Sequence, residues 1–553
     1  MNTALRPMYK WEAVKWPKAE RTVYKLQKRI YRAAERGDRK RVRRLQKLLL
    51  RSRTAKLLAV RQVTQDNRGK RAPGVDGKAS LTPTERLQLV DELQLDGEAA
   101  PVRRVEIPKP GTSETRPLGI PTIADRAKQS LVKLVLEPKW EARFEANSYG
   151  FRPGRSTWDA IGAIYVQINQ KPKWALDADI AKCFDRIGHA ALLRKIDANP
   201  TVTRQIKAWL KAGVVDKGEL FPTEAGTPQG GTISPLLANI ALHGLEELIE
   251  HRYPGRNKPA VIRYADDLVV LHPDRQVIEQ CQALIAEQLI GMGLELKPSK
   301  TRITHTLSVT EGEAGFDFLG FNIRQYRVKR SKRGYKTIIK PSRKSIERHR
   351  RQVVEVIRRH QNDSQARFID ALNPVIRGWS NYFSTVCSKE TFGKLDGELR
   401  QQLRAWMRYR HPQKSLKAGY NKYFHRAGGR LDFIPRKGGK RLHDHAETPI
   451  KRHVKVQGQR SPFDGDEVYW SARRGHHPGV APRVARLLKQ QHGRCAQCGG
   501  YFKAGDILEM DHIVARREGG RDVKANFQLL HRYCHVRKTA HERRRYACPV
   551  LHD

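Results

Sequence analysis

An apolar, β-branched stretch runs from Val261 to Leu271 and is interrupted at its centre by Asp266 and Asp267. β-branched and apolar residues on both sides of a short polar break predict two strands joined by a tight turn. The two carboxylates would then lie at the tip of a hairpin, where they repel each other and lose hydration. A divalent cation such as Mg²⁺ would neutralise them, because it prefers oxygen ligands and leaves positions for phosphates.

A second strand pattern, which begins at Trp174, carries Asp177 and Asp179. Residues two apart on a strand point to the same face, so these two carboxylates share one. An Asp pair alone more often marks a surface turn. With a third carboxylate nearby, the set could instead hold two metal ions for an in-line phosphoryl displacement.

Helical spacing of apolar residues marks three regions. The segment from Tyr24 to Ser52 predicts two short helices with a break at Gly37-Asp38, and Ala124 to Phe144 predicts one long helix. Residues Ser345 to Arg410 are also helical by pattern. The basic faces of the first pair are either solvated or contact RNA. Phe424 to Pro482 is rich in Gly, Arg, His and Pro with weak periodicity, which indicates a small basic domain or a linker.

Two further stretches carry candidate binding residues. Two strands around a Gly/Pro turn place Lys109 and Arg116 near each other across a hairpin. These cations either clamp a triphosphate or are ordinary surface charges. A glycine-rich string from Gly226 to Ile240 lets the backbone approach a substrate closely. Within it, Gln229 either hydrogen-bonds an incoming nucleotide or packs against a template.

Composition indicates several domains and a polyanionic partner. At 553 residues the chain exceeds the size of one hydrophobic core. A net charge of +50 points to nucleic acid, with an acidic membrane surface as the competing partner. No apolar run approaches the roughly 20 residues that span a bilayer, and the N-terminus does not resemble a secretory signal. The seven cysteines, four of which cluster at the C-terminal end, do not indicate a disulfide framework, so we expect a reducing compartment.

These motifs resemble the palm of reverse transcriptases, which has an Asp followed five residues later by an aromatic, and then Tyr-x-Asp-Asp. Strings at Tyr149–Ser156, Gly293–Thr301 and Phe316–Phe321 resemble other motifs of that family, the last being a primer-grip hairpin. The helical block around Pro374–Phe383 is similar to the thumb or maturase domain of group II intron proteins. The resemblance implies that Asp179, Asp266 and Asp267 bind Mg²⁺, and that Phe184 stacks on the nucleotide sugar and excludes a 2′-OH. It also implies that Lys109 and Arg116 bind the triphosphate and that Lys300 lies by the active-site phosphates or primer. Gln229 would contact the incoming nucleotide or the template.

The C-terminal segment contains four residues spaced for one tetrahedral Zn²⁺. They are Cys495 and Cys498, with His531 and Cys534 expected three apart on a helix. Cys548 is a rival fourth ligand. The remaining thiols, at Cys183, Cys281 and Cys387, are expected to be buried and inert.

The same segment resembles an HNH nuclease of the ββα-metal type, because an Asp-His pair is followed by an Asn and a further His. That resemblance implies His512 as the general base and Asn526 as the residue that orients the loop. It also implies that Asp511 and His535 hold a catalytic Mg²⁺ or Mn²⁺. The alternative, a purely structural zinc ribbon, explains the thiols but leaves these four residues unexplained.

The chain is therefore identified as similar to a group II intron reverse transcriptase-maturase with an HNH endonuclease domain. The expected fold is α+β: a right-hand polymerase with fingers and palm, a helical thumb, and a small zinc-containing ββα-metal nuclease domain. Expected partners are intron RNA, target DNA and deoxynucleoside triphosphates, with no membrane, in the bacterial cytoplasm. A retron or defence reverse transcriptase and a non-enzymatic RNA-splicing chaperone remain the alternatives. The expected domains are 1–70 (basic helices), 71–335 (fingers and palm), 336–423 (thumb), 424–485 (basic DNA-binding region or linker) and 486–553 (nuclease).

Overall fold

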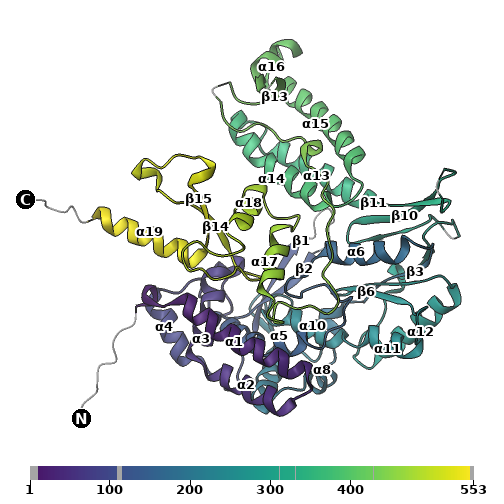
Figure 1. Cartoon of the computed structure of the whole chain (residues 1–553), viewed down its shortest axis with the longest axis vertical. Coiled ribbons are helices and arrows are strands. Elements are labelled where there is room, and N and C mark those ends of the chain that lie inside the picture. The colour runs from purple at the N-terminus through teal and green to yellow at the C-terminus, as the bar shows by residue number, and fades with distance from the viewer. Residues whose placement is uncertain are drawn as a thin grey trace, which may run out of the picture.

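The C-terminal segment lies at the left of the view above the N-terminal helices, and the thumb helices lie at the top (Figure 1). The computed structural model describes residues 10–108, 115–310, 312–330, 332–427, 429–436 and 438–547. Helices and strands are mixed throughout these residues. This confirms the expected α+β class.

The palm sheet carries the paired aspartates and has four antiparallel strands in the order β6-β7-β3-β8. In β7, Leu268 and Val270 pack into one core, and Val269 and Leu271 pack into another on the opposite face. A sheet covered on both faces needs apolar residues at every position, which explains the continuous run. The predicted hairpin and strand are confirmed. The strands are β3 (Trp174–Asp179), β6 (Ala260–Tyr264), β7 (Asp267–His272) and β8 (Arg302–His305).

Helices cover both faces of the palm sheet. One face packs on α5, α8, α9, α10 and α12, and the other on α6 with the hairpin that follows the palm. The predicted helix from Ala124 is α5, capped by the Thr122 side chain, and it ends three residues earlier than expected. These helices are α5 (Ile123–Glu141), α6 (Thr157–Ile168), α7 (Cys183–Arg186), α8 (His189–Ile196), α9 (Pro200–Lys211), α10 (Ser234–Leu242), α11 (Leu245–Arg252) and α12 (Arg275–Ile290).

The fingers sheet has the strand order β2-β1-β4-β5. Its first two strands form the predicted antiparallel hairpin, in which Arg116 lies opposite Ile107. Lys109 lies outside the described residues, so its predicted place beside Arg116 has no structural counterpart here. The strands are β1 (Val102–Pro108), β2 (Thr115–Ile120), β4 (Val214–Asp216) and β5 (Glu219–Phe221).

The N-terminal helices form a layer against α5 with a core of their own. The predicted break at Gly37-Asp38 is confirmed, because Asp38 Oδ1 accepts a hydrogen bond from Arg41 N and caps the second helix. The first helix begins at Trp16, eight residues before the predicted start, and buries the indole of that tryptophan. The helices are α1 (Trp16–Glu35), α2 (Arg39–Arg51), α3 (Arg53–Arg61) and α4 (Pro83–Glu92).

The thumb follows a three-stranded sheet with the order β11-β10-β9. Its three long helices confirm the helical pattern predicted from Ser345 to Arg410. Phe383 is buried and Trp379 and Tyr382 pack against the same core, as expected for most aromatics of that block. The elements are β9 (Phe316–Phe318), β10 (Phe321–Arg327), β11 (Tyr335–Pro341), α13 (Arg343–Arg359), α14 (Gln365–Phe383), α15 (Lys389–Arg410), α16 (Leu416–Tyr423), β12 (Phe424–Ala427) and β13 (Arg430–Phe433).

Residues 448–466 run without helix or strand from the thumb back across the palm. The fully buried Asp159 of α6 holds this segment, since its Oδ1 accepts hydrogen bonds from Val456 N at 2.8 Å and His453 Nε2 at 3.0 Å, and it also pairs with Arg473. The segment leads to α17 (Glu467–Gly475) and α18 (Pro482–Gln490). A ββα unit follows: β14 (Leu508–His512), β15 (Phe527–His531) and α19 (Arg532–Ala547).

Candidate active sites and nucleic-acid interface

The palm sheet brings the predicted polymerase aspartates together. Asp179 ends β3 and is the cross-strand partner of Asp267, which begins β7. Asp266 lies in the turn before it, next to Ala265, whose φ of 58° places it in the left-handed region. All three aspartates are half-buried. The ammonium of Lys300, just before β8, pairs with the Asp179 carboxylate.

Crowding of carboxylates makes their charged forms unfavourable. Burial, together with the charges of Asp266 and Asp179, raises the pKa of Asp267 to about 7. Burial and the nearby Asp179 also raise the pKa of Asp266, while Arg116 and Lys300 act in the opposite direction. A cation close to these carboxylates therefore favours their charged forms, so the site is suited to bind a divalent metal ion.

A buried arginine supports residues 264–267, the turn that carries two of the predicted catalytic aspartates and is called the catalytic turn below. Arg263 of β6 is 2% exposed and donates from Nη1 to Ala265 O at 3.1 Å and to Asn239 Oδ1 at 3.0 Å. Its Nη2 lies 3.8 Å from the Glu145 carboxylate. Asn239 Nδ2 in turn donates to Gly150 O at 2.8 Å. These residues were not singled out from the sequence, although a lone arginine in an apolar run beside two aspartates is a signal.

Gly150 has no room for a side chain, because a Cβ there would meet Ala265 N at 2.2 Å. The loop that carries Gly150 therefore packs directly on the catalytic turn. The next residue, Phe151, is 47% exposed, and its ring contacts that of Phe184 edge-on, with centroids 6.0 Å apart. Phe184 lies in α7 and is half-buried. No role for Phe151 was predicted from the sequence.

The glycine-rich string lies against α7. Thr227 N donates to Phe184 O at 2.7 Å, and a Cβ on Gly226 would meet that same oxygen at 2.7 Å. Gln229 Nε2 is 3.5 Å from Asp185 Oδ1, and its backbone oxygen accepts from Gly119 N of β2 at 2.6 Å. The string thus joins the fingers to the palm beside Phe184.

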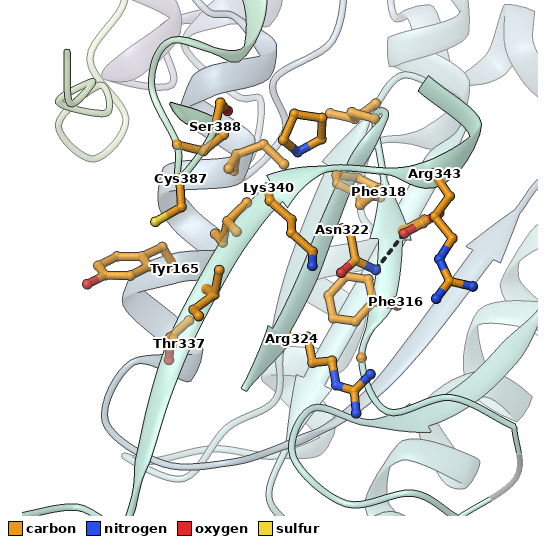
Figure 2. A pocket seen from close by; sticks show the side chains of 18 of the residues that line it. Tyr165, Phe316, Phe318, Asn322, Arg324, Thr337, Lys340, Arg343, Cys387 and Ser388 are labelled. Atoms are coloured by element: carbon orange, nitrogen blue, oxygen red, sulfur yellow. Dashed lines mark hydrogen bonds between the residues drawn. The ribbon is translucent and has the colours of Figure 1, made fainter. Parts of the chain in front are cut away.

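A cleft of about 1820 Å³ begins at Asp179, Asp267 and Lys300 and extends between the palm and the thumb. Figure 2 shows the β10–β11 hairpin along its wall, with Asn322, Arg324 and Lys340 directed into it. Asn322 and Lys340 are cross-strand partners, so polar and cationic side chains share one face of this hairpin. An open cleft lined by cations and leading to carboxylates suits a nucleic-acid strand.

The C-terminal unit contains a second metal-ready group. Among the described residues, the side chains whose ligand atoms all lie within 4.8 Å of one another are Cys495, Cys498, His531 and Cys534. The palm aspartates do not form such a group among the described residues. The rival ligand Cys548 lies outside the described residues.

One detail of the expected zinc site is wrong. His531 is not on a helix with Cys534: it is the last residue of β15, paired with Leu508, and Cys534 lies in the first turn of α19. Strand pairing of Phe527 to His531 extends the backbone up to the ligand. His531 Nδ1 is 3.4 Å from Cys498 Sγ, and its Nε2 is 3.4 Å from Asp506 Oδ2. A carboxylate behind a ligating imidazole orients it and increases its basicity.

The predicted nuclease residues lie on the ββα unit. His512 ends β14, and its Nε2 is hydrogen-bonded to Asp522 Oδ1 at 2.6 Å. Asn526 Oδ1 accepts from Val514 N at 2.8 Å, and its Nδ2 donates to Val514 O and Arg521 O at 3.0 Å, so this amide closes the intervening loop.

The neighbouring carboxylate of this unit is Asp511. Its Oδ1 lies 3.5 Å from His535 Nε2, and Lys538 Nζ donates to its Oδ2 at 2.7 Å. The structure thus brings Asp511 and His535 together from β14 and α19. Asp522 and Lys538 are further polar residues of this site that the sequence analysis missed.

These sites define a nucleic-acid polymerase joined to a ββα-metal unit. Four family models match the chain: "N-terminal domain of reverse transcriptase" over 11–93, "Reverse transcriptase (RNA-dependent DNA polymerase)" over 107–323, "Group II intron, maturase-specific domain" over 346–424, and "HNH endonuclease" over 495–541.

Curated relatives agree with these matches. Protein YkfC of Escherichia coli is 32% identical over 51% of this chain and 83% of its own length. Group II intron-encoded protein LtrA of Lactococcus lactis is 32% identical over 43% of this chain, but that region is 41% of LtrA. A solved structure of apo telomerase from Candida tropicalis is 15% identical, with a TM-score of 0.32 over 41% of this chain and 53% of that one, which is too distant to interpret.

The chain belongs to the group II intron-encoded reverse transcriptase-maturase family and carries a C-terminal HNH endonuclease domain. It is a multifunctional intron protein with RNA-directed DNA polymerase and nuclease activities, and such domains use divalent metal ions and act on nucleic acid. No helix among the described residues is both long and apolar enough to cross a membrane.

Proposed function

We propose that Asp179, Asp266 and Asp267 hold the Mg²⁺ ions of reverse transcription. The observation that carries this assignment is the pairing of Asp179 with Asp267 across β3 and β7, with Asp266 on the adjoining turn and the cationic cleft beside them. Bound Mg²⁺ supplies charge stabilisation as the primer 3′ oxygen bonds to the α-phosphorus and pyrophosphate leaves. The chain's own residues fix where both reactants lie.

The residues around the triad position the nucleotide. Phe184 stacks on its sugar and excludes a 2′-OH, supported edge-on by Phe151. Gln229 contacts the nucleotide or template from the glycine-rich string. Arg116 on β2 and Lys300 at the cleft bind phosphates or primer, since both cations act electrostatically on Asp266. Lys109 is proposed as a further phosphate contact from its sequence position.

We assign DNA strand cleavage to the ββα unit. His512 accepts the proton of the attacking water, and its hydrogen bond to Asp522 holds the ring. Asn526 orients the loop. Asp511 and His535 bind the nuclease Mg²⁺ or Mn²⁺. A structural Zn²⁺ is bound by Cys495, Cys498, His531 and Cys534, because three thiols and an imidazole are ligands that zinc prefers.

The substrates follow from these assignments. The thumb and basic surfaces bind the intron RNA, the nuclease cleaves target DNA, and the palm extends the cleaved strand with deoxynucleoside triphosphates, which together move the intron. The bacterial cytoplasm is the proposed location, supported by the bacterial origin of both relatives. The domain boundaries proposed from the sequence (70, 335, 423 and 485) are kept.

A matched pair of aspartates tests the polymerase assignment. Asp267→Asn removes one proposed ligand. Asp177→Asn changes a carboxylate that lies on the same face of the palm sheet but outside the triad. Burial and the charge of Asp267 raise the pKa of Asp177 to about 7 as well, so the two substitutions perturb similar groups. Primer extension on RNA should fall at least about a hundredfold for Asp267→Asn, since a metal ion contributes several kcal/mol to the transition state.

Asp177→Asn should extend primers at nearly the rate of the unchanged protein. Retained extension by Asp267→Asn, or an equal loss in both variants, would show that the triad is assigned to the wrong residues.

A further inference from the structure

A tyrosine next to two of the four proposed zinc ligands contacts the N-terminal helices. Tyr533 lies between His531 and Cys534 in the chain, and its ring stacks on the His531 imidazole with centroids 5.0 Å apart and planes 8° apart. Its hydroxyl donates to Glu20 Oε2 of α1 at 2.9 Å. The Tyr533 side chain packs against both the core of the nuclease unit and that of the N-terminal helices. One residue therefore links a metal ligand to a helix more than 500 positions away in sequence.

Arg61 of α3 completes this contact. Its guanidinium lies 4.7 Å from the ring centre of Trp16 and 4.9 Å from that of Tyr533, so it is held between two aromatic faces. It also pairs with Glu20 at 2.6 Å and Asp66 at 3.1 Å. The side chain is only 13% exposed. A planar cation between two rings, with two carboxylates, fixes the orientation of the rings as well as their distance.

A second edge of the same unit also contacts α1. The Lys503 ammonium lies 4.0 Å from the ring centre of Tyr24, and the Tyr24 hydroxyl donates to Pro462 O at 2.7 Å. Lys28 pairs with Glu467 of α17 at 3.2 Å. Arg474 of α17 hydrogen-bonds the backbone oxygens of Lys503 and Asp506, and Asp506 faces His531. Two separate contacts prevent the unit from rotating about either one.

The proposed nuclease residues take no part in these contacts. Within the described part of the chain, His512, Asn526 and Asp511 form hydrogen bonds only with residues of the C-terminal unit itself. The unit is thus held by its zinc end, and its cleavage side remains available to DNA. Figure 1 shows α19 beside the N-terminal helices, well apart from the thumb.

We propose that the face of α1 and α3 formed by Trp16, Glu20 and Arg61 is a docking platform for the chain's own endonuclease domain. Through Tyr533 it holds that domain in one orientation relative to the palm, so that the DNA end produced by cleavage is passed to the polymerase as a primer. This inference rests on the proposed nuclease function. It assigns positioning residues for a coupled reaction, because none of the three touches a reacting atom.

Full-length variants separate coupling from the two activities. Arg61→Met removes the cation between the rings, and Tyr533→Phe removes only the hydroxyl. Arg53→Met is the control, since Arg53 lies on the same helix but pairs with Asp91 at the surface. Three products are measured: nicked target DNA, extension of a supplied annealed primer, and DNA synthesis from the nick. Hydrogen exchange of residues 527–540 reports docking directly.

We expect nicking and supplied-primer extension to be retained in all variants. Synthesis per nick should fall about tenfold in Arg61→Met, because loss of docking lowers the effective concentration of the DNA end at the palm. Synthesis per nick should fall less in Tyr533→Phe, and it should be partly restored in Arg61→Lys relative to Arg61→Met. Hydrogen exchange in 527–540 should accelerate in Arg61→Met and not in Arg53→Met.

Unchanged exchange and unchanged synthesis per nick in Arg61→Met would overturn the platform. So would a loss of zinc and nicking in Arg61→Met, because the contact would then serve only the stability of the nuclease unit. Absence of nicking by the unchanged protein would instead refute the proposed nuclease function, and the exchange measurement would still decide docking.

Discussion

Replacing Arg263 by methionine should disable polymerisation without touching a metal ligand. The Arg263 guanidinium donates to the oxygen of Ala265, the residue in the left-handed conformation immediately before Asp266. Such a conformation costs roughly 1–2 kcal/mol for a residue with a Cβ, so it persists only where the surroundings hold it. Removing the donor allows the turn to relax and moves Asp266 and Asp267 relative to Asp179.

The loss of stability can be estimated from the contacts. Breaking a buried ion pair by removing one partner costs about 3–5 kcal/mol. The lower end applies here, because the Glu145 carboxylate keeps hydrogen bonds from Gly244 N at 2.7 Å and Glu246 N at 2.9 Å. A loss of about 3 kcal/mol lowers the Tm of a domain of this size by roughly 6–12 °C.

Arg152 provides a comparison of similar burial that donates no hydrogen bond to the turn, although it also binds the backbone oxygens of Glu145 and Ser148. Its side chain is 0% exposed and binds Glu141 through two hydrogen bonds of 2.9 and 3.0 Å. Arg152→Met should lose comparable stability. Assayed well below both Tm values, Arg263→Met should show at least tenfold lower kcat and a higher half-saturating Mg²⁺ concentration, about 1.4 kcal/mol or more in the transition state.

Arg152→Met should keep both kinetic parameters, and Arg263→Lys should recover part of the kcat. If Arg263→Met loses stability yet keeps its kcat and its Mg²⁺ requirement, the guanidinium serves the fold alone and does not position the catalytic turn.

Three further results are expected. Phe184→Val should raise ribonucleotide incorporation relative to deoxynucleotide, and an unchanged ratio would mean that the ring only packs. Cys495→Ser should lower bound zinc and destabilise the nuclease unit, whereas His512→Ala should keep zinc and lose strand cleavage; loss of zinc in the latter would make that histidine structural. Burial and the nearby His445 lower the pKa of His349 to about 3, so the unfolded chain binds the proton more readily below pH 6.5. Between pH 6.5 and 5 the thumb should therefore lose about 1.6 kcal/mol of unfolding free energy, and the unfolding free energy of His349→Gln should fall by that much less over the same pH range.

The palm was predictable from the sequence because its determinants are local. Apolar residues on both sides of Asp266 and Asp267 predicted two strands joined by a tight turn, and the pairing of β6 with β7 confirms it. The helix break at Gly37-Asp38 was equally local, since Asp38 caps the helix that it precedes. Such features need only a few neighbouring residues to be recognised.

Residues whose partners are distant in sequence were missed. Arg263 depends on Glu145 and Asn239, and no spacing within its own strand indicates either partner. The error at His531 has a similar origin. A separation of three residues predicted one helix, but pairing of β15 with β14 extends the strand up to that ligand. Tertiary pairing decided the local structure there.

Lysines lie on the acidic groups of both proposed catalytic centres, although the centres have unrelated folds. Lys300 contacts Asp179 in the palm, and Lys538 contacts Asp511 in the nuclease unit. Carboxylates gathered for a divalent ion destabilise the protein whenever the ion is absent, because like charges repel in a partly desolvated site. An ammonium on a flexible stem offsets that charge and can move to a phosphate oxygen when the ion binds. The same side chain can therefore offset the repulsion between the carboxylates and reach a substrate phosphate, and each acidic cluster has such a lysine close by.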